Sequence, residues 1–168
     1  IDHPRGLVGH SDGDVVAHAL TDALLGGAGL ADIGALFPSD DERYRGADSL
    51  VLLAEAYRQV REAGFELVNA DCIVIAQEPR VAPHRSAMRD RLCAALGVDP
   101  ARVNVRATTT DALGFTGRGE GVAAQAVALL AASPLLSANS VHAQTKLVVG
   151  MPTTPPNIVL MPLHVGKD

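Results

Sequence analysis

The sequence predicts a single α/β domain, with a mixed sheet of about four strands and helices on one face of that sheet. Two observations support this prediction. Apolar residues recur at helical spacing in four segments, whereas two other segments are rich in β-branched residues and read as strands. The chain has 168 residues, 48% of them hydrophobic, which is enough for one core built mostly of Ala, Val and Leu.

The first helix is predicted over about residues 12–25, where Ser11 can accept the N–H of Asp14 in a near capping box. Asp14, His18 and Asp22 are spaced four residues apart and therefore share one face of this helix. A histidine between two carboxylates suits metal ligation, with Asp14 or Asp22 holding its second ring nitrogen. The alternative is a solvated polar face on which His18 only pairs with Asp22.

The remaining elements follow a polar loop that contains several Asp, Ser and Gly residues. They are, in order, a helix over residues 48–63, a strand over 65–77, a helix over 83–96, a strand over 102–110 and a helix over 120–131. We expect the strand segments around Cys72 and Val105 to pair within one sheet.

Several positions could hold phosphate or sugar groups, although each also has an ordinary explanation as part of a strand or turn. His10 lies just before a helix N-terminus and can meet an anion. Thr108, Thr109 and Thr110 lie at a strand end, where their hydroxyls offer donors and acceptors together. The Asp111 carboxylate suits Mg²⁺, and Arg118, which stands among glycines, suits phosphate.

Composition limits the classes of function. The net charge of −5 argues against nucleic acid or a membrane surface as the main partner. Cys72 and Cys93 lie in apolar runs and are expected to be reduced core residues, and the sequence contains neither a leader pattern nor a span of membrane length. We therefore expect a cytoplasmic protein. Residues 1–132 are predicted to form the domain, and residues 133–168 a Pro-rich apolar tail of unknown role.

Five motifs, taken together and in order, resemble the 2-C-methyl-D-erythritol 2,4-cyclodiphosphate synthase family. They are GHSDGDVVAHALTDALLGGAGLADIGALFP, GADS, IVIAQEPRVAPH, NVRATTT and GFTGRGEG. The resemblance implies a homotrimer with an active site at each subunit interface. It also implies conversion of 4-diphosphocytidyl-2-C-methyl-D-erythritol 2-phosphate to the cyclic diphosphate with release of CMP, a lyase step of non-mevalonate isoprenoid biosynthesis.

The resemblance further implies roles for individual positions. The catalytic residues implied are His10 and Thr109. Those implied to bind substrate are Ser11, Asp32, Ile33, Gly34, Phe37, Asp41, Ala76, Gln77, Glu78, Pro79, Arg80, Val81, Ala82, Thr108, Thr110, Phe115 and Arg118. The implied metal ligands are His18 for zinc and Asp111 for magnesium. Residues expected on sheet faces buried between subunits are Val68, Ala70 and Val105.

The chain departs from the family pattern in two ways. The family begins with a strand carrying Asp-x-His, two of its three zinc ligands, and this chain is expected to lack that strand, which leaves the zinc site incomplete. Ser39 stands where the family tends to carry an acid. One alternative is therefore a catalytically impaired nucleotide-binding trimer, which zinc analysis would distinguish. Another is a metal-dependent phosphohydrolase built on the first helix, which would release inorganic phosphate.

Overall fold

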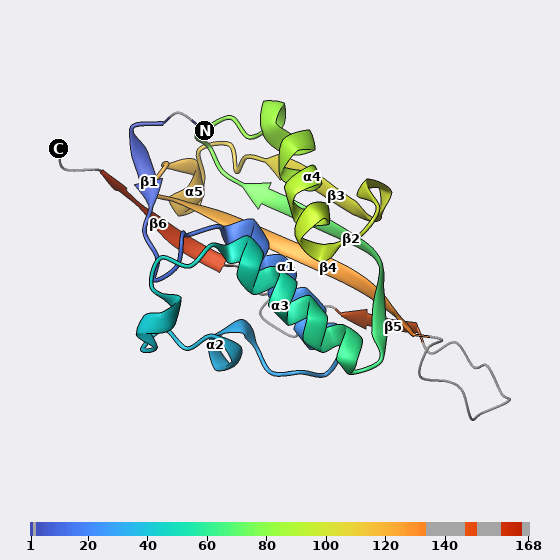
Figure 1. The fold of residues 1–168 in the computed structure, drawn as a ribbon. Coiled ribbons are helices and arrows are strands. Elements are labelled where there is room, and N and C mark those ends of the chain that lie inside the picture. The colour runs from blue at the N-terminus through green and yellow to red at the C-terminus, as the bar shows by residue number, and fades with distance from the viewer. Residues whose placement is uncertain (2, 134–146, 151–158, 166–168) are drawn as a thin grey trace, which may run out of the picture.

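The computed structural model describes residues 1, 3–133, 147–150 and 159–165. Within them a six-stranded sheet runs in the order β1-β6-β4-β2-β3, with β5 also paired to β4 (Figure 1). The strands are β1 (Arg5–Leu7), β2 (Phe65–Ile75), β3 (Val103–Thr108), β4 (Gly121–Ala132), β5 (Leu147–Gly150) and β6 (Val159–Val165). The sheet therefore has more strands than the four that the sequence predicts.

Three longer helices lie on one side of this sheet (Figure 1). They are α1 (Val15–Gly27), α3 (Ser49–Glu62) and α4 (Arg85–Leu96), and the short helices are α2 (Ile33–Leu36) and α5 (Gly114–Gly117). The three longer helices match three of the predicted segments to within a few residues. In the described part of the chain, no helix has the length and apolar character needed to cross a membrane.

The sheet is mixed, as predicted. Strands β2 and β3 are parallel, with Cys72 opposite Val105, so the predicted pairing of these two segments is confirmed. The other pairs are antiparallel. Strands β5 and β6 pair with residues 128–131 and 121–124 of β4 respectively, so segments of the predicted tail line one edge of β4. The rest of that tail lies outside the described residues.

The predicted helix over residues 120–131 is wrong, because this segment is the central strand β4. Alanine favours helices in isolation, but tertiary context overrides such a weak preference. Ala124, Ala126 and Ala128 alternate on the buried side of β4, the strand against which α1 packs. Their small side chains allow the helix and the sheet to pack closely.

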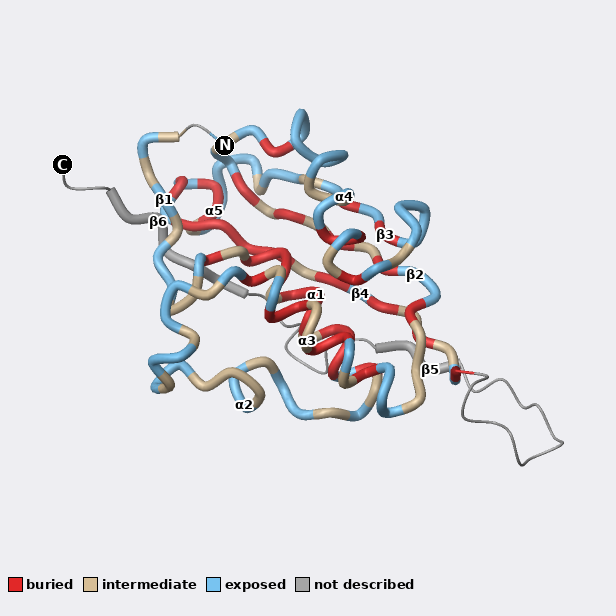
Figure 2. The backbone as a smooth tube through the Cα atoms, viewed as in Figure 1, coloured by how far each residue is buried: buried red, intermediate tan, exposed pale blue. Residues whose placement is uncertain are grey.

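A β-bulge corrects a second prediction. Leu67 pairs with Leu130 and Asn69 with Leu129, which leaves Val68 as an extra residue in β2. The bulge shifts the alternation of side chains by one residue, so Val68 is exposed while Ala70 faces the core. Figure 2 shows buried stretches along β2 and β4. Ala70 and Val105 are each only 5% exposed and pack beneath the helices, so the expectation that they lie between subunits is wrong.

Candidate functional site

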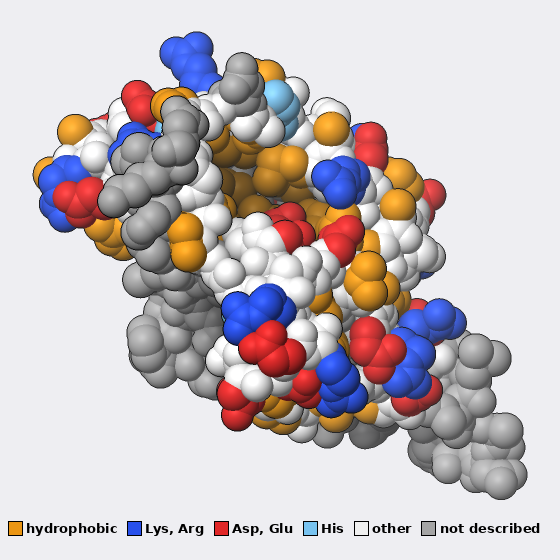
Figure 3. Space-filling view, turned by 60° about the vertical axis from the view of Figure 1, so that its left-hand side comes forward, with side chains coloured by type: hydrophobic (Ala, Val, Ile, Leu, Met, Phe, Trp, Pro, Cys, Tyr) orange, Lys and Arg blue, Asp and Glu red, His pale blue; other side chains and the backbone are white. Residues whose placement is uncertain are grey.

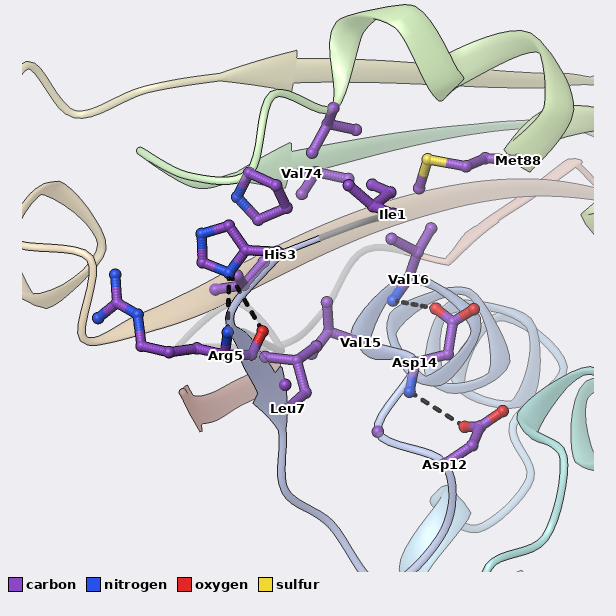
Figure 4. A pocket seen from close by; sticks show the side chains of 15 residues that line it. Ile1, His3, Arg5, Leu7, Asp12, Asp14, Val15, Val16, Val74 and Met88 are labelled. Carbon is purple, nitrogen blue, oxygen red and sulfur yellow. Dashed lines mark hydrogen bonds between the residues drawn. The ribbon is translucent and has the colours of Figure 1, made fainter. Parts of the chain in front are cut away.

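The loop before α1 is fixed by two aspartates. The Asp14 side chain caps α1 by accepting the N–H groups of Val16 and Ala17 at 2.9 and 3.0 Å. Asp12 in turn accepts the N–H of Asp14 at 3.1 Å (Figure 4). The predicted contact from Ser11 to the Asp14 N–H is therefore wrong, and α1 begins at Val15. Since Ser11 does not cap the helix, its hydroxyl is available to a neighbouring pocket.

That pocket has a volume of about 280 Å³ and lies at the start of α1. It is lined by His10, Ser11, His18, Ile33, Gly34, Phe37, Ser39, Tyr44 and Leu52. Six of these nine residues belong to the predicted site. These six residues, which the family resemblance implied for the site, therefore lie together in one cavity, which we call the histidine pocket.

His18 is held by two hydroxyl groups. Its Nε2 lies 3.1 Å from Ser11 Oγ and 3.0 Å from Ser49 Oγ. The prediction that Asp14 or Asp22 would hold this ring is wrong, because Asp14 caps α1 and Asp22 accepts the N–H of Ile33 at 2.9 Å. Neither Ser49 nor its partner Asp12 was among the predicted site residues.

Burial shifts the titration of two groups near this pocket. Desolvation lowers the pKa of His18, and the negative charges of Asp14, Asp12 and Asp22 only partly oppose it. Desolvation also raises the pKa of Asp22, although the hydrogen bond from Ile33 opposes that rise. The His18 imidazole is therefore favoured in its neutral form.

His10 carries an unusual feature. Its Nε2 is buried, and within the described residues it is the one buried side-chain nitrogen or oxygen without a hydrogen-bond partner. Leaving such an atom unpaired costs about 1–3 kcal/mol. Because His10 lines the pocket together with Ser11, the unpaired nitrogen points to a ligand group that would complete its hydrogen bonding.

Two predicted substrate residues lie next to this pocket and do not line it. Asp32 caps α2 by accepting the N–H of Ala35 at 2.8 Å. Asp41 accepts hydrogen bonds from Nε and Nη2 of Arg43, and this contact lowers the pKa of the Asp41 carboxyl. His18 and His10 therefore share the histidine pocket with Ile33, whereas Asp32 itself does not line it.

The segment of residues 76–82, which the family resemblance implies in substrate binding, borders a second cavity of about 390 Å³. Its walls are mainly hydrophobic and acidic side chains stand at its edge (Figures 3 and 4). Pro79 and Val81 line it, while Gln77, Glu78, Arg80 and Ala82 are exposed. Ala76 is buried and donates its N–H to the Thr108 carbonyl at 3.1 Å, which joins this segment to the end of β3.

The threonine run forms a tight turn away from the histidine pocket. Thr109 Oγ1 donates to Asp111 Oδ1 at 3.2 Å, and Thr110 Oγ1 donates to the Leu113 carbonyl at 2.6 Å. Asp111 and Ala112 have positive φ values of 50° and 65°, a strained conformation for residues other than glycine. None of these residues lines the histidine pocket, so a single chain does not bring Thr109 to His10.

The two predicted residues after this turn lie in and beside α5. Phe115 is half-buried within the helix. Arg118 follows the helix and pairs with Glu120 through two hydrogen bonds of 2.7 and 2.8 Å. The guanidinium group is thus engaged within its own chain, and Arg118 does not line the histidine pocket.

The predicted metal ligands are isolated in the described part of the chain. No group of three or more His, Cys, Asp or Glu side chains placed to hold a metal ion occurs there. A catalytic zinc normally takes three protein ligands. His18 alone therefore does not make a zinc site from the described residues, and Asp111 alone does not make a magnesium site.

The geometry defines an α/β domain with a histidine–serine pocket at the N-terminus of a helix packed on a mixed sheet. The chain belongs to the YgbB family, whose model matches residues 1–131. It is 61% identical over 130 residues to the 2-C-methyl-D-erythritol 2,4-cyclodiphosphate synthase of Moorella thermoacetica, covering 77% of this chain and 80% of that protein. The family resemblance seen in the sequence is confirmed.

Solved structures agree with this assignment. A 2C-methyl-D-erythritol-2,4-cyclodiphosphate synthase with bound CDP is 41% identical, with a TM-score of 0.66, covering 73% of this chain and 79% of that one. The bifunctional IspDF from Campylobacter jejuni is 51% identical, with a TM-score of 0.72, covering 74% of this chain. This chain spans only 34% of that longer protein.

Proposed function

We propose that this chain converts 4-diphosphocytidyl-2-C-methyl-D-erythritol 2-phosphate to 2-C-methyl-D-erythritol 2,4-cyclodiphosphate and releases CMP. The step is a lyase reaction of non-mevalonate isoprenoid biosynthesis. The names of the relatives support it, at 61% identity over most of the chain. The observation that carries it is the unpaired, buried His10 Nε2 in a pocket that also holds Ser11 and His18.

The reaction takes place between two phosphates of the substrate and requires no covalent bond to the protein. A 2-phosphate oxygen attacks the β-phosphorus, a new P–O bond forms, and the bond from that phosphorus to the CMP oxygen breaks. Catalysis then consists of aligning the two phosphates and stabilising the charge on their oxygens. His10 Nε2 and the Ser11 hydroxyl are suited to contact those oxygens from the histidine pocket. Ile33, Gly34 and Phe37 line the same pocket and would surround the methylerythritol part of the substrate.

We propose that the site is completed by a second subunit of a homotrimer. The described chain keeps Thr109 and the segment of residues 76–82 away from its own histidine pocket. A neighbouring subunit can supply both, with the buried Ala76 and Val81 forming the base of a cytidine pocket. His18 and Asp111 remain the proposed positions for zinc and magnesium. Among the described residues, neither one belongs to a group of three or more side chains that could hold a metal ion.

Turnover with the purified chain tests this proposal. Incubation with the diphosphocytidyl substrate should release CMP and the cyclic diphosphate in equal amounts, measured by chromatography and phosphorus NMR. His10→Ala should lower kcat by about 10²-fold or more, because it removes a group that contacts the reacting phosphates. His84→Ala is the control, since His84 is exposed at the start of α4. Release of inorganic phosphate in place of CMP would contradict the proposal and favour a phosphohydrolase.

A further inference from the structure

Strand β6 lies beyond residues 1–131, the part of the chain that the family model matches, yet it joins two strands of that part (Figure 1). Residues 159–162 of β6 pair with residues 121–124 of β4, and residues 163–165 pair with β1. Among the described residues β1 pairs with no other strand. The ladder with β6 is therefore what attaches β1 to the sheet.

Strand β1 in turn supports the loop that carries His10 and Ser11. Leu7, the last residue of β1, lies against Gly13, because a Cβ added at Gly13 would meet the Leu7 Cβ at 3.1 Å and the Leu7 carbonyl group at 3.6 Å. Gly13 has a φ of 76°, so the backbone turns there directly before Asp14, the cap of α1. The position of Leu7 therefore limits where this turn can lie.

The other side of the same loop is attached to the segment before α3. Gly46 donates its N–H to the His10 carbonyl at 2.7 Å, and Asp12 donates its N–H to the Ala47 carbonyl at 3.1 Å. The loop thus has one support on the side of α3 and another on the side of β1. Without the second support, it would gain freedom to move toward the space that Leu7 occupies.

We propose that β6 is a positioning element for the histidine pocket, which anchors β1 to β4 so that Leu7 holds the loop carrying His10 and Ser11. Strand β1 has only three residues, and without β6 the backbone groups of its ladder would lose their partners. The effect of β6 on turnover rests on the proposed function. Its effect on the loop is independent of turnover and can be measured separately.

Hydrogen exchange of the whole chain, followed by mass spectrometry, tests the anchoring. Adjacent residues of a strand direct their N–H groups to opposite sides, so either Leu163→Pro or His164→Pro removes a donor that faces β1. That variant should raise the exchange rates of residues 5–13 by about tenfold or more. Val148→Pro is the control, because β5 pairs with β4 and should leave these rates unchanged. Unchanged rates in both β6 variants would overturn the proposal.

Turnover of the same variants separates positioning from substrate binding. If the loop carrying His10 and Ser11 is displaced, kcat for CMP release should fall by about tenfold or more with KM nearly unchanged, because these groups act on the reacting phosphates. A rise in KM with kcat unchanged would overturn the proposal. If the wild-type chain releases no CMP, the proposed function fails, and the exchange rates of residues 5–13 still decide the role of β6.

A cysteine pair decides the same question if the proline variants do not fold. Gly6 and His164 are partners in the β1–β6 ladder, and a Cβ at Gly6 meets no atom of the described residues within 4 Å. Opposite Cβ atoms in such a ladder lie about 4.5–5.5 Å apart, close to disulfide geometry. Gly6→Cys with His164→Cys should therefore form a disulfide on oxidation, whereas Gly6→Cys with Val148→Cys should not.

The disulfide should also slow hydrogen exchange of residues 5–13 relative to the same protein after reduction, because it suppresses separation of β1 from β6. Failure of the first cysteine pair to form a disulfide would overturn the proposal. Equal exchange of these residues in the oxidised and reduced protein would overturn it as well.

Discussion

At the scale of single residues, the half-buried ring of His18 makes the stability of the folded chain depend on pH. Its pKa is lowered because burial disfavours the imidazolium, so the unfolded chain binds a proton at a higher pH than the folded chain does. The contribution of His18 to stability is therefore present above its ordinary pKa of about 6.5 and is lost as pH falls through the lower folded value.

This linkage predicts a pH-dependent difference between the wild-type protein and His18→Gln. Lowering the pH from about 7.5 to about 5.5 should reduce the Tm of the wild-type protein more than that of the variant, because glutamine takes up no proton. Thermal denaturation followed by circular dichroism at several pH values measures the difference. Parallel losses of Tm in both proteins would show that His18 is not responsible.

A second residue-scale prediction concerns Gly117. A Cβ added there would overlap the backbone of Ala112, within the strained turn that carries Thr109 and Asp111. Gly117→Ala should therefore destabilise the protein by about 1–3 kcal/mol, measured by urea denaturation, as overpacked sites do. Gly26→Ala is the control, since Gly26 lies in α1 and a Cβ added there would meet no other atom within 4 Å. That substitution should leave stability unchanged or raise it by up to about 1 kcal/mol, and equal effects of the two substitutions would contradict the argument.

Much of the histidine pocket could be predicted from sequence, but its hydroxyl partners could not. Helical spacing places His18 beside Asp14 and Asp22, because it compares only residues three or four apart. Ser49 is 31 residues from His18 and 37 from Asp12, and only the packing of α3 beside α1 brings them together. A motif can therefore name such a residue, but contact geometry is needed to assign its role.

At the scale of elements, the start of α1 is the best-defined boundary. Asp14 caps the helix through two backbone N–H groups. Asp14→Ala should cost about 0.5–2 kcal/mol of stability, whereas Asp14→Asn should cost much less, because asparagine caps nearly as well. Chemical denaturation of the three proteins measures these differences. If Asp14→Asn lost as much stability as Asp14→Ala, charge would matter more here than capping.

Two elements show where periodicity fails as a guide. Strand β4 was predicted as a helix because its alanines satisfy either period, and only its place between β2 and β6 makes it a strand. The bulge at Val68 reverses the alternation in β2 in a way that no two-residue pattern contains. The helices, with one apolar stripe each, were predicted correctly because they cover a single face of the sheet.

At the scale of the whole molecule, the sheet is covered by helices on one side. On its other side Val127 is 42% exposed, and Asp71 forms an ion pair with Arg106 across β2 and β3. Ile73 and Leu129 on this side are half-buried. A sheet face that no helix of the described residues covers, with apolar and paired charged residues on it, supports the proposed homotrimer, in which neighbouring subunits would cover it. The cytoplasmic location remains a prediction.

Matched valine substitutions on the two sides of the molecule test that assembly. Val127 lies opposite Asp71 in the β2–β4 ladder, so a lysine there can pair with this carboxylate and should leave the single chain folded. In a trimer, however, Val127→Lys would bury a charge between subunits, so the mass measured by light scattering should fall from three times 17.4 kDa toward one. Val51 is 64% exposed on α3, so Val51→Lys should leave the trimer intact.

The same pair of variants connects assembly to activity. If the histidine pocket needs Thr109 of a neighbouring subunit, Val127→Lys should lose CMP release together with its trimeric mass, whereas Val51→Lys should keep both. A wild-type protein that is monomeric at micromolar concentration would contradict the trimer. A monomeric Val127→Lys protein that still turns over substrate would instead show that one chain completes the site alone. Because the substitution lies on β4, away from the residues that line the histidine pocket, loss of activity in the folded variant would follow from loss of the neighbouring subunit.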